Sequence, residues 1–226
     1  MTAQSDYLYV KKLYEEHADP ETAVPMAHYM RDQFQYYGLK SPIRRELVRE
    51  FLKEKNRQDL DWAFVDLCFQ DDYRELQYVA CDYLTRKAKK LQASDLGKIK
   101  KLVQTKSWWD TVDSLVKLVG KIFLKEENKQ AVMKTVRDWA VDPDFWVRRT
   151  AIEFQLGLKT ATDPELLKEI ILENLGSSEF FINKAIGWAL RDYSKTNPDW
   201  VRKFVNEYRE QLAPLSVREA SKYIFI

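Results

Sequence analysis

The residues best suited to chemistry lie in the string Lys106-Ser107-Trp108-Trp109-Asp110-Thr111-Val112-Asp113. Trp109 and Asp113 are four residues apart, so they share one face if this segment is a helix. An aromatic ring and a carboxylate both attract positive charge. The pair therefore indicates chemistry on a cationic ring compound. The alternative is an aromatic residue at the edge of the core and a solvated aspartate.

A helix must hold this pair, and the sequence predicts one. Ser107 is followed three residues later by Asp110, which is typical of a helix start. An apolar stripe with helical spacing follows, formed by Trp108, Val112, Leu115, Val116 and Val119. We expect this stripe to face the core and Trp109 and Asp113 to lie on the neighbouring face.

A second unusual aromatic residue lies in the segment 178–193. Its apolar stripe consists of Ile182, Ala185, Ile186, Ala189, Leu190 and Tyr193. Trp188 falls about 200° around the helix from Ile186, with Lys184 and Arg191 as helical neighbours. An outward tryptophan between two cations needs a cover, either a partner helix or a ligand. Gly187 beside it allows a second backbone to approach closely.

Self-similarity connects these segments. The buried-stripe residues Ala80, Leu115, Ala151 and Ala185 are separated by 35, 36 and 34 residues. This period is typical of an α-solenoid of degenerate HEAT-like units, and about six helix pairs fit the length. Asp113, Arg149 and Asn183 then occupy one repeat position and should form a row. An ion pair between Asp113 and Arg149 and a binding role are both consistent with that row.

Composition supports an all-α protein. The 226 residues include 45% hydrophobic side chains but only 6 Gly and 7 Pro, so helix breakers are few. Helices are predicted over 5–18, from Pro20 to Gly38, from Ser41 through Phe51, and over 59–70, 72–90 and 94–105. Segments 198–212 and 214–226 give the last pair, and the apolar end at 223–226 is expected to be docked or cut short.

Several function classes are disfavoured. No apolar run reaches membrane length and the N-terminus has no signal-peptide character, so we expect a soluble, cytoplasmic protein. Cys68 and Cys81 are predicted to be buried thiols. With His17 and His28 as the only histidines, a histidine-based metal site or catalytic triad is not expected.

The net charge of +2 does not by itself indicate a nucleic-acid-binding protein. The charges are nevertheless unevenly distributed. An acidic zone comprises Asp59, Asp61, Asp66, Asp71, Asp72 and Glu75, and a basic cluster comprises Arg86, Lys87, Lys89, Lys90, Lys98, Lys100, Lys101 and Lys106. The basic cluster is either a solvated helix face or a patch that contacts phosphates.

The chain resembles the AlkD-type DNA glycosylases, which are built of HEAT-like repeats. The matching strings are Pro25-Met26-Ala27-His28-Tyr29-Met30, residues 106–113, Ile122-Phe123-Leu124-Lys125, the segment 149–156, and Phe180-Phe181-Ile182 continuing through Lys184-Ala185-Ile186-Gly187-Trp188. Lys195-Thr196-Asn197-Pro198 and Leu212-Ala213-Pro214-Leu215-Ser216 complete the resemblance, which covers nearly the whole chain in order.

The resemblance implies a single domain over residues 1–226, a right-handed α-solenoid with a concave, basic surface. It implies hydrolysis of the N-glycosidic bond of N3- or N7-alkylated purines in duplex DNA, without a metal or organic cofactor. Asp113 would be the catalytic carboxylate, Trp109 and Trp188 the aromatic walls, and Arg149 a phosphate contact. Further DNA-contacting residues would be Arg148, Tyr29, Lys106, Lys184 and Arg191. The protein is expected to be a monomer, associated with the nucleoid if bacterial.

The residues themselves fit this chemistry. An alkylated purine is already cationic, so the departing base needs no general acid, and positive charge develops on the sugar. A carboxylate stabilises that charge and orients the attacking water. Two alternatives remain: a non-catalytic helical scaffold that binds a protein or undamaged DNA, and a metal-dependent nuclease that uses Asp110 and Asp113.

Overall fold

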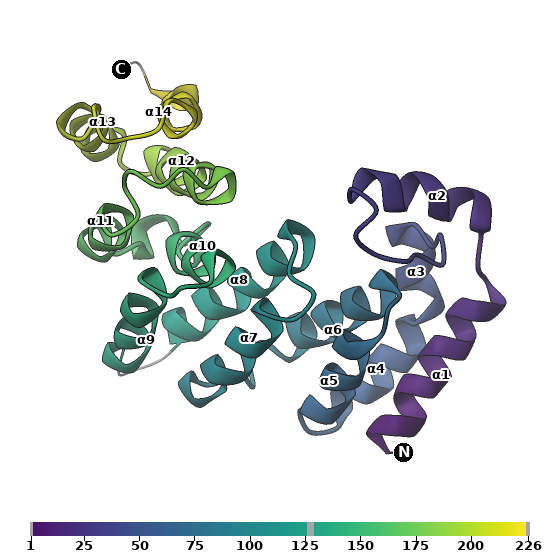
Figure 1. Cartoon of the computed structure of the whole chain (residues 1–226). Coiled ribbons are helices and arrows are strands. Elements are labelled where there is room, and N and C mark those ends of the chain that lie inside the picture. Colours follow the sequence, from purple (N-terminus) through teal and green to yellow (C-terminus); the bar gives the residue numbers. More distant parts are fainter. Residues whose placement is uncertain (1, 126–128, 225–226) are drawn as a thin grey trace. The chain divides into compact units, whose positions relative to one another are not determined.

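The computed structural model describes residues 2–125 and 129–224, and these residues form helices joined by short connections (Figure 1). Their contacts divide the chain into two compact units, residues 1–90 and 91–226. Within the described ranges, the only β-type pairing is an isolated bridge between Gln35 and Tyr73. The all-α prediction is therefore confirmed. No helix in these ranges is both long and apolar enough to cross a bilayer.

The described residues of unit 1 form six α-helices: α1 (Ala3–Glu16), α2 (Pro20–Tyr29), α3 (Ser41–Leu47), α4 (Arg49–Arg57), α5 (Trp62–Gln70) and α6 (Arg74–Lys87). Asp19 caps α2, and Pro20 stands in the first turn, as predicted. The helix expected from Ser41 through Phe51 is interrupted at Val48, whose φ of −98° and ψ of 8° separate α3 from α4.

The prediction of one helix from Pro20 to Gly38 is wrong, because α2 ends at Tyr29. Arg31 and Asp32 both adopt positive φ, which stops a right-handed helix. The chain then passes the buried carboxylate of Glu75, which accepts hydrogen bonds from the backbone N–H groups of Tyr37, Gly38 and Leu39 at 3.0–3.1 Å. These bonds give an extended segment the partners that a helix would supply internally.

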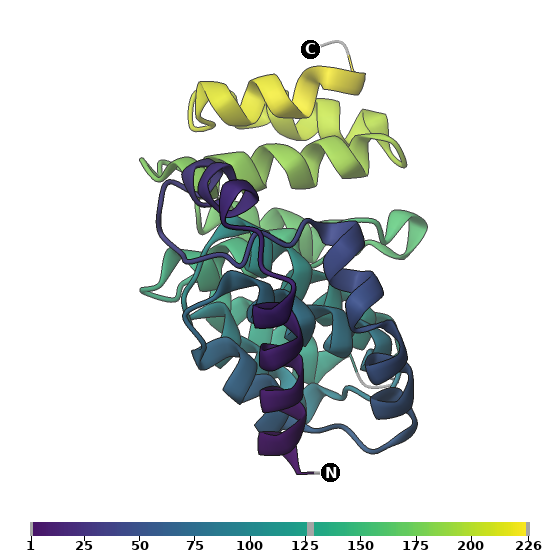
Figure 2. The same cartoon turned by 90° about the vertical axis from the view of Figure 1, so that its right-hand side faces the viewer.

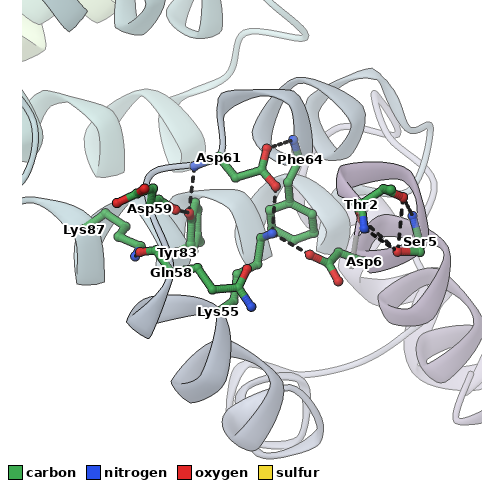
Figure 3. A network of polar contacts seen from close by, with 10 residues as sticks. All are labelled: Thr2, Ser5, Asp6, Lys55, Gln58, Asp59, Asp61, Phe64, Tyr83 and Lys87. Atoms are coloured by element: carbon green, nitrogen blue, oxygen red, sulfur yellow. Dashed lines mark hydrogen bonds and ion pairs between the residues drawn. The ribbon is translucent and has the colours of Figure 1, made fainter.

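A buried ion network connects the helices of unit 1 (Figure 3). The ammonium of Lys55 contacts Asp6 at 2.6 Å and Asp61 at 2.8 Å, and the Lys55 and Asp6 side chains are each only 2% exposed. Lys87, predicted as part of a basic cluster, is buried and donates to the carbonyl groups of Asn56 and Gln58. Its inclusion in a DNA-facing patch is therefore wrong, because its ammonium binds backbone carbonyl groups of unit 1 and is not available to DNA.

Unit 2 contains eight α-helices within its described residues: α7 (Leu96–Val103), α8 (Trp109–Lys125), α9 (Gln130–Ala140), α10 (Phe145–Glu153), α11 (Pro164–Leu172), α12 (Phe180–Ser194), α13 (Pro198–Glu207) and α14 (Pro214–Ala220). Short 3-10 turns cover Ala93–Asp95, Lys159–Ala161 and Ser221–Tyr223. Most consecutive helices pack against one another, and α10 also packs against α8 and α12. Figure 2 shows α12, α13 and α14 side by side.

The predicted repeat anchors are all buried. Leu115, Ala151 and Ala185 in unit 2 and Ala80 in unit 1 are at most 1% exposed. Cys68 and Cys81 are buried free thiols, as predicted. Ile224 is buried, whereas Phe225 and Ile226 of the predicted apolar end lie outside the described residues.

Gly187 is required by the contact between α12 and α14. A Cβ atom at this position would lie 2.6 Å from the Cβ of Glu219 and 3.1 Å from the carbonyl oxygen of Ser216. The prediction that Gly187 permits a close approach of another backbone is thus confirmed. Gly97, in contrast, has nothing within 4 Å of its would-be Cβ.

We expect Gly187→Ala to lower the free energy of unfolding by about 1–3 kcal/mol, because the added methyl forces α14 away from α12. Gly97→Ala, the matched control on α7, should instead raise it by about 0.5 kcal/mol through reduced backbone entropy of the unfolded chain. Urea denaturation of the two variants measures both effects. Equal stability of the two variants would contradict the close contact at Gly187.

Candidate active site

Asp113 lies on α8 and is held by Arg149 on α10. The Arg149 Nε and Nη2 atoms donate to Asp113 Oδ1 at 3.1 and 2.8 Å. The Asp113 side chain remains 25% exposed, so solvent reaches a carboxylate whose position is fixed from behind. The ion pair that the repeat spacing left open is therefore present, and it leaves Asp113 accessible.

Arg149 is among the most deeply buried charged residues in unit 2, with its side chain 2% exposed. Besides Asp113, its guanidinium donates through Nη1 to the backbone carbonyl of Phe181 at 2.9 Å. The prediction that Arg149 contacts a phosphate directly is not supported by this burial, because its donors face protein acceptors. Arg149 instead connects α8, α10 and the first turn of α12.

A second carboxyl group lies behind this pair. Glu153, one turn after Arg149 on α10, is 1% exposed, and its Oε1 lies 3.0 Å from Arg149 Nη2. Burial raises the pKa of Asp113, although the Arg149 guanidinium opposes the rise. Burial also raises the pKa of Glu153, to about 8, with Arg149 opposing and the Asp113 carboxylate reinforcing the rise. The site thus has two carboxyl groups and one guanidinium.

Trp188 on α12 also lies close to the Arg149 guanidinium. The centre of its ring is 5.5 Å from Arg149 Cζ, 5.5 Å from Lys184 Nζ and 5.6 Å from Arg191 Cζ. The two helical neighbours predicted for Trp188 therefore flank it, and Arg149 makes a third cation. Its Nε1 atom is buried and has no hydrogen-bond partner among the described residues. Trp188 is half-buried rather than fully outward.

Glu219 on α14 forms ion pairs with the cations beside Trp188. Its side chain is 4% exposed and contacts Lys184 at 2.8 Å, Arg191 at 2.6 Å and Lys222 at 2.8 Å. Burial alone would raise the pKa of Glu219, but the ammonium groups of Lys184 and Lys222 lower it to about 2. The carboxylate is ionised at neutral pH and holds Lys184 and Arg191 in place. These contacts join α14 to the two cations that flank Trp188 on α12.

An aromatic cluster supports the start of α8. The ring of Trp108 contacts those of Trp146 and Phe181, with centroids 5.8 and 5.3 Å apart. Trp146 and Phe181 also contact each other at 4.7 Å. These residues come from the N-terminal turns of α8, α10 and α12 or from the residue just before them, so the cluster aligns the helix starts that carry the site.

The other predicted site residues have diverse environments. Trp109 begins α8 and is half-buried, one turn before Asp113. Arg148 donates at 2.7 Å to the carbonyl of Asp142 in the loop that precedes α10. Lys106 precedes α8 with φ of 46°, a left-handed conformation unusual for lysine. Tyr29 belongs to unit 1, where it is 71% exposed and lines a groove of about 320 Å³.

Two important residues were missed by the sequence analysis. Glu153 stands four residues after Arg149, a spacing that places both on one helix face. Glu219 stands 35 residues after Lys184, close to the repeat period. Both signals were present, but acidic residues at such spacings are common on solvated faces. Among residues 2–125 and 129–224, no group of three or more His, Cys, Asp or Glu residues is placed to hold a metal ion.

We expect Glu219→Gln to lower the free energy of unfolding by about 1–3 kcal/mol at neutral pH, because Lys184 and Arg191 then face a neutral amide. The folded-state pKa is below the ordinary value of 4.5, so the stabilisation by Glu219 is present above pH 4.5 and is lost as the pH falls towards about 2. Urea denaturation of the wild type and of Glu219→Gln, from neutral pH down to about pH 2, measures whether their free energies of unfolding become equal.

Glu169→Gln is the matched control for this prediction. The Glu169 carboxylate pairs with Arg137, and both side chains are more than a third exposed. Solvent screens such a pair, so its loss should cost about 0–1 kcal/mol. A loss for Glu219→Gln no larger than that of the control would contradict the role of Glu219 as the organising anion.

Comparison with known proteins gives the family. A family model described as DNA alkylation repair enzyme matches residues 10–224. A solved structure described as a predicted DNA alkylation repair enzyme from Enterococcus faecalis has 37% sequence identity and a TM-score of 0.84, covering 92% of this chain and 96% of that one. No protein among the curated ones matches this chain.

Two structures from Streptococcus mutans share the fold at lower identity. AlkD2 has 20% identity and a TM-score of 0.58, covering 78% of this chain and 88% of that one. The protein smu.31 from strain UA159 has 18% identity and a TM-score of 0.61, with 97% and 100% covered. The match over residues 10–224 and the likeness to the Enterococcus structure place the chain in a family: it belongs to the DNA alkylation repair enzymes.

Proposed function

We propose that this chain is a DNA glycosylase that hydrolyses the N-glycosidic bond of N3- or N7-alkylated purines in duplex DNA. One observation carries the proposal: Asp113 remains 25% exposed while two hydrogen bonds from buried Arg149 fix its carboxylate. The exposed side of this carboxylate is open to a substrate, while the Arg149 hydrogen bonds hold the carboxylate in one position. Membership of the DNA alkylation repair enzymes supplies the substrate class.

The reaction follows from the charge of the substrate. An alkylated purine carries positive charge, so the bond between the sugar C1′ and the base nitrogen breaks with its electron pair returning to the base. The sugar becomes oxocarbenium-like, and the Asp113 carboxylate stabilises that charge. A water molecule that donates a hydrogen bond to Asp113 then bonds to C1′ and gives its proton to the Asp113 carboxylate, which releases it to solvent. Both Arg149 bonds converge on Oδ1, which leaves the lone pairs of Oδ2 outside the Arg149 contact.

The two tryptophans are proposed to flank the damaged nucleotide. Trp109 lies one turn before Asp113 on α8, and the Trp188 ring centre lies 5.5 Å from Cζ of the guanidinium that holds Asp113. Each aromatic face adds about 0.5–2 kcal/mol of attraction for a cation.

DNA contacts are proposed for the remaining cations. Lys184 and Arg191 are each about a quarter exposed beside Trp188, and both are ion-paired with Glu219. Arg148, Lys106 and the exposed Tyr29 are further proposed contacts with the backbone of duplex DNA. Arg149 is assigned instead to holding Asp113. The protein is proposed to act as a monomer.

A non-catalytic scaffold is the second candidate. The observation that favours it is the Asp113–Arg149 ion pair itself, which joins α8 to α10 whether or not any reaction occurs. The two candidates differ in what Asp113 contributes. For an enzyme the negative charge acts on the substrate, whereas for a scaffold it only neutralises Arg149.

Asp113→Asn should reduce the release of 7-methylguanine from methylated duplex DNA by at least about 100-fold, because the amide cannot stabilise the sugar cation. DNA binding, measured by fluorescence anisotropy over a salt series, should be retained. The amide oxygen can still accept from Arg149, so the variant should remain folded, as circular dichroism would verify. Equal release by the two proteins would reject the mechanism and favour the scaffold.

The proposed site should discriminate lesions by charge. Free 7-methylguanine should be released from duplexes that contain it. The rate of uracil release from otherwise identical duplexes should be at least about 1,000-fold lower, because a neutral base is a poor leaving group without a general acid. Quantifying free bases by chromatography tests this. Comparable rates on the two substrates would show that the site supplies a proton to the leaving base.

A further inference from the structure

Glu153 is a buried carboxyl group to which the proposed mechanism gives no role. It is 1% exposed, and neither carboxyl oxygen accepts a hydrogen bond from the described residues. Its contact with Arg149 Nη2 at 3.0 Å is an ion contact without the geometry of a hydrogen bond. An ionised carboxylate buried with two unsatisfied oxygens is strongly disfavoured.

The surrounding charges explain how this cost is avoided. Arg149 Nη2 lies 2.8 Å from Asp113 Oδ1 and 3.0 Å from Glu153 Oε1, so one nitrogen faces both carboxyl groups. A single guanidinium neutralises only one negative charge. Two carboxyl groups at such a site share a proton, as like charges close together cannot both ionise. The proton belongs on Glu153, because Asp113 has the hydrogen bonds and the access to solvent that stabilise an anion.

We propose that Glu153 carries a proton at neutral pH and donates it in a hydrogen bond to Asp113, as a positioning residue that leaves Asp113 the only anion at Arg149. This inference rests on the proposed function of Asp113. One proton converts an orphaned oxygen into a donor directed at a neighbouring acceptor. Asp113 is then held by Arg149 and by Glu153, and the Asp113–Arg149–Glu153 group is neutral.

The charged groups around α10 support this assignment. On α8, Asp110 and Lys117 act on Asp113 with opposite signs. On α12, Lys184 and Arg191 contact Glu219. On α7, α9 and α11, Lys100 contacts Asp142, Arg137 contacts Glu169, and Lys168 contacts Glu207. The groups that act on Glu153 are thus Arg149 and Asp113, and the pKa of about 8 agrees with a proton at neutral pH.

Two variants of similar size distinguish a Glu153 that donates a hydrogen bond to Asp113 from a Glu153 that only fills space in the core. Glu153→Gln keeps an N–H donor beside Asp113 and should retain kcat within about threefold, whereas Glu153→Met fills the space without a donor and should lower kcat about tenfold with KM little changed. Thermal unfolding by circular dichroism identifies any variant that fails to fold. Equal losses in the two variants, or a loss in Glu153→Gln as large as in Asp113→Asn, would overturn the proposal.

The pH dependence provides a readout that a packing role would not change. Above about pH 8 Glu153 ionises, and two anions then compete for one guanidinium, so the rate of the wild type should fall. The profile of Glu153→Gln on the same DNA should lack this fall. Because the folded-state pKa is raised from 4.5, the stabilisation by the proton is complete below pH 4.5 and is lost through about pH 8. The melting temperature of the wild type should therefore fall relative to that of Glu153→Gln over this range.

Infrared spectroscopy tests the proton without any reaction. The difference spectrum of wild type minus Glu153→Gln should contain a carboxylic-acid C=O band at neutral pH that disappears above about pH 9. The proposal would be overturned if the band were absent. It would also be overturned if the difference in melting temperature between the wild type and Glu153→Gln did not change between pH 4.5 and about pH 8. These two measurements give the same answer even if the wild type releases no base, so failure of the proposed function remains distinguishable.

Discussion

The buried guanidinium of Arg149 is the interaction on which the site depends. A permanently charged group that is 2% exposed is tolerated only where anions and carbonyl groups surround it. Asp113 on α8 and the backbone of Phe181 on α12 meet that demand from two sides of α10. Three helices are therefore fixed by the fork geometry of one side chain. The position of the exposed carboxylate follows from this constraint rather than from the packing of α8 alone.

Charge pairs between helical elements that do not follow each other directly in the chain recur through unit 2. Lys100 on α7 contacts Asp142 before α10, Arg149 contacts Asp113, and Arg191 contacts Glu219 on α14. Many of the 37 basic residues are thus neutralised by the 35 acidic ones at contacts within the fold. The small net charge of +2 is consistent with this arrangement. It also means that counting lysines and arginines along the chain overstates the charge available to DNA.

How much could be predicted from the sequence depended on the range of the interactions. Apolar periodicity predicted α12 and its buried stripe, and the repeat spacing of 36 residues predicted that Asp113 meets Arg149. The helix prediction was wrong over residues 30–38. Phe34 and Tyr37 have helical spacing, but the positive φ of Arg31 and hydrogen bonds to the carboxylate of Glu75 determine the conformation of this segment. Local pattern cannot reveal a partner 38 residues away.

The protonation states near Trp188 determine which chemistry the proposed site can perform. Glu219 is ionised, with a pKa of about 2, and its oxygens are occupied by lysine and arginine. Glu153 is sealed behind Arg149, so the proton proposed for it faces Asp113 rather than solvent. Neither group can protonate a departing base. The proposed site, with its exposed carboxylate and aromatic faces, is then suited to receive positive charge, and neither of these two glutamates supplies a proton to a leaving base. Such a site favours substrates that are already cationic, because only these carry their own driving force for bond cleavage.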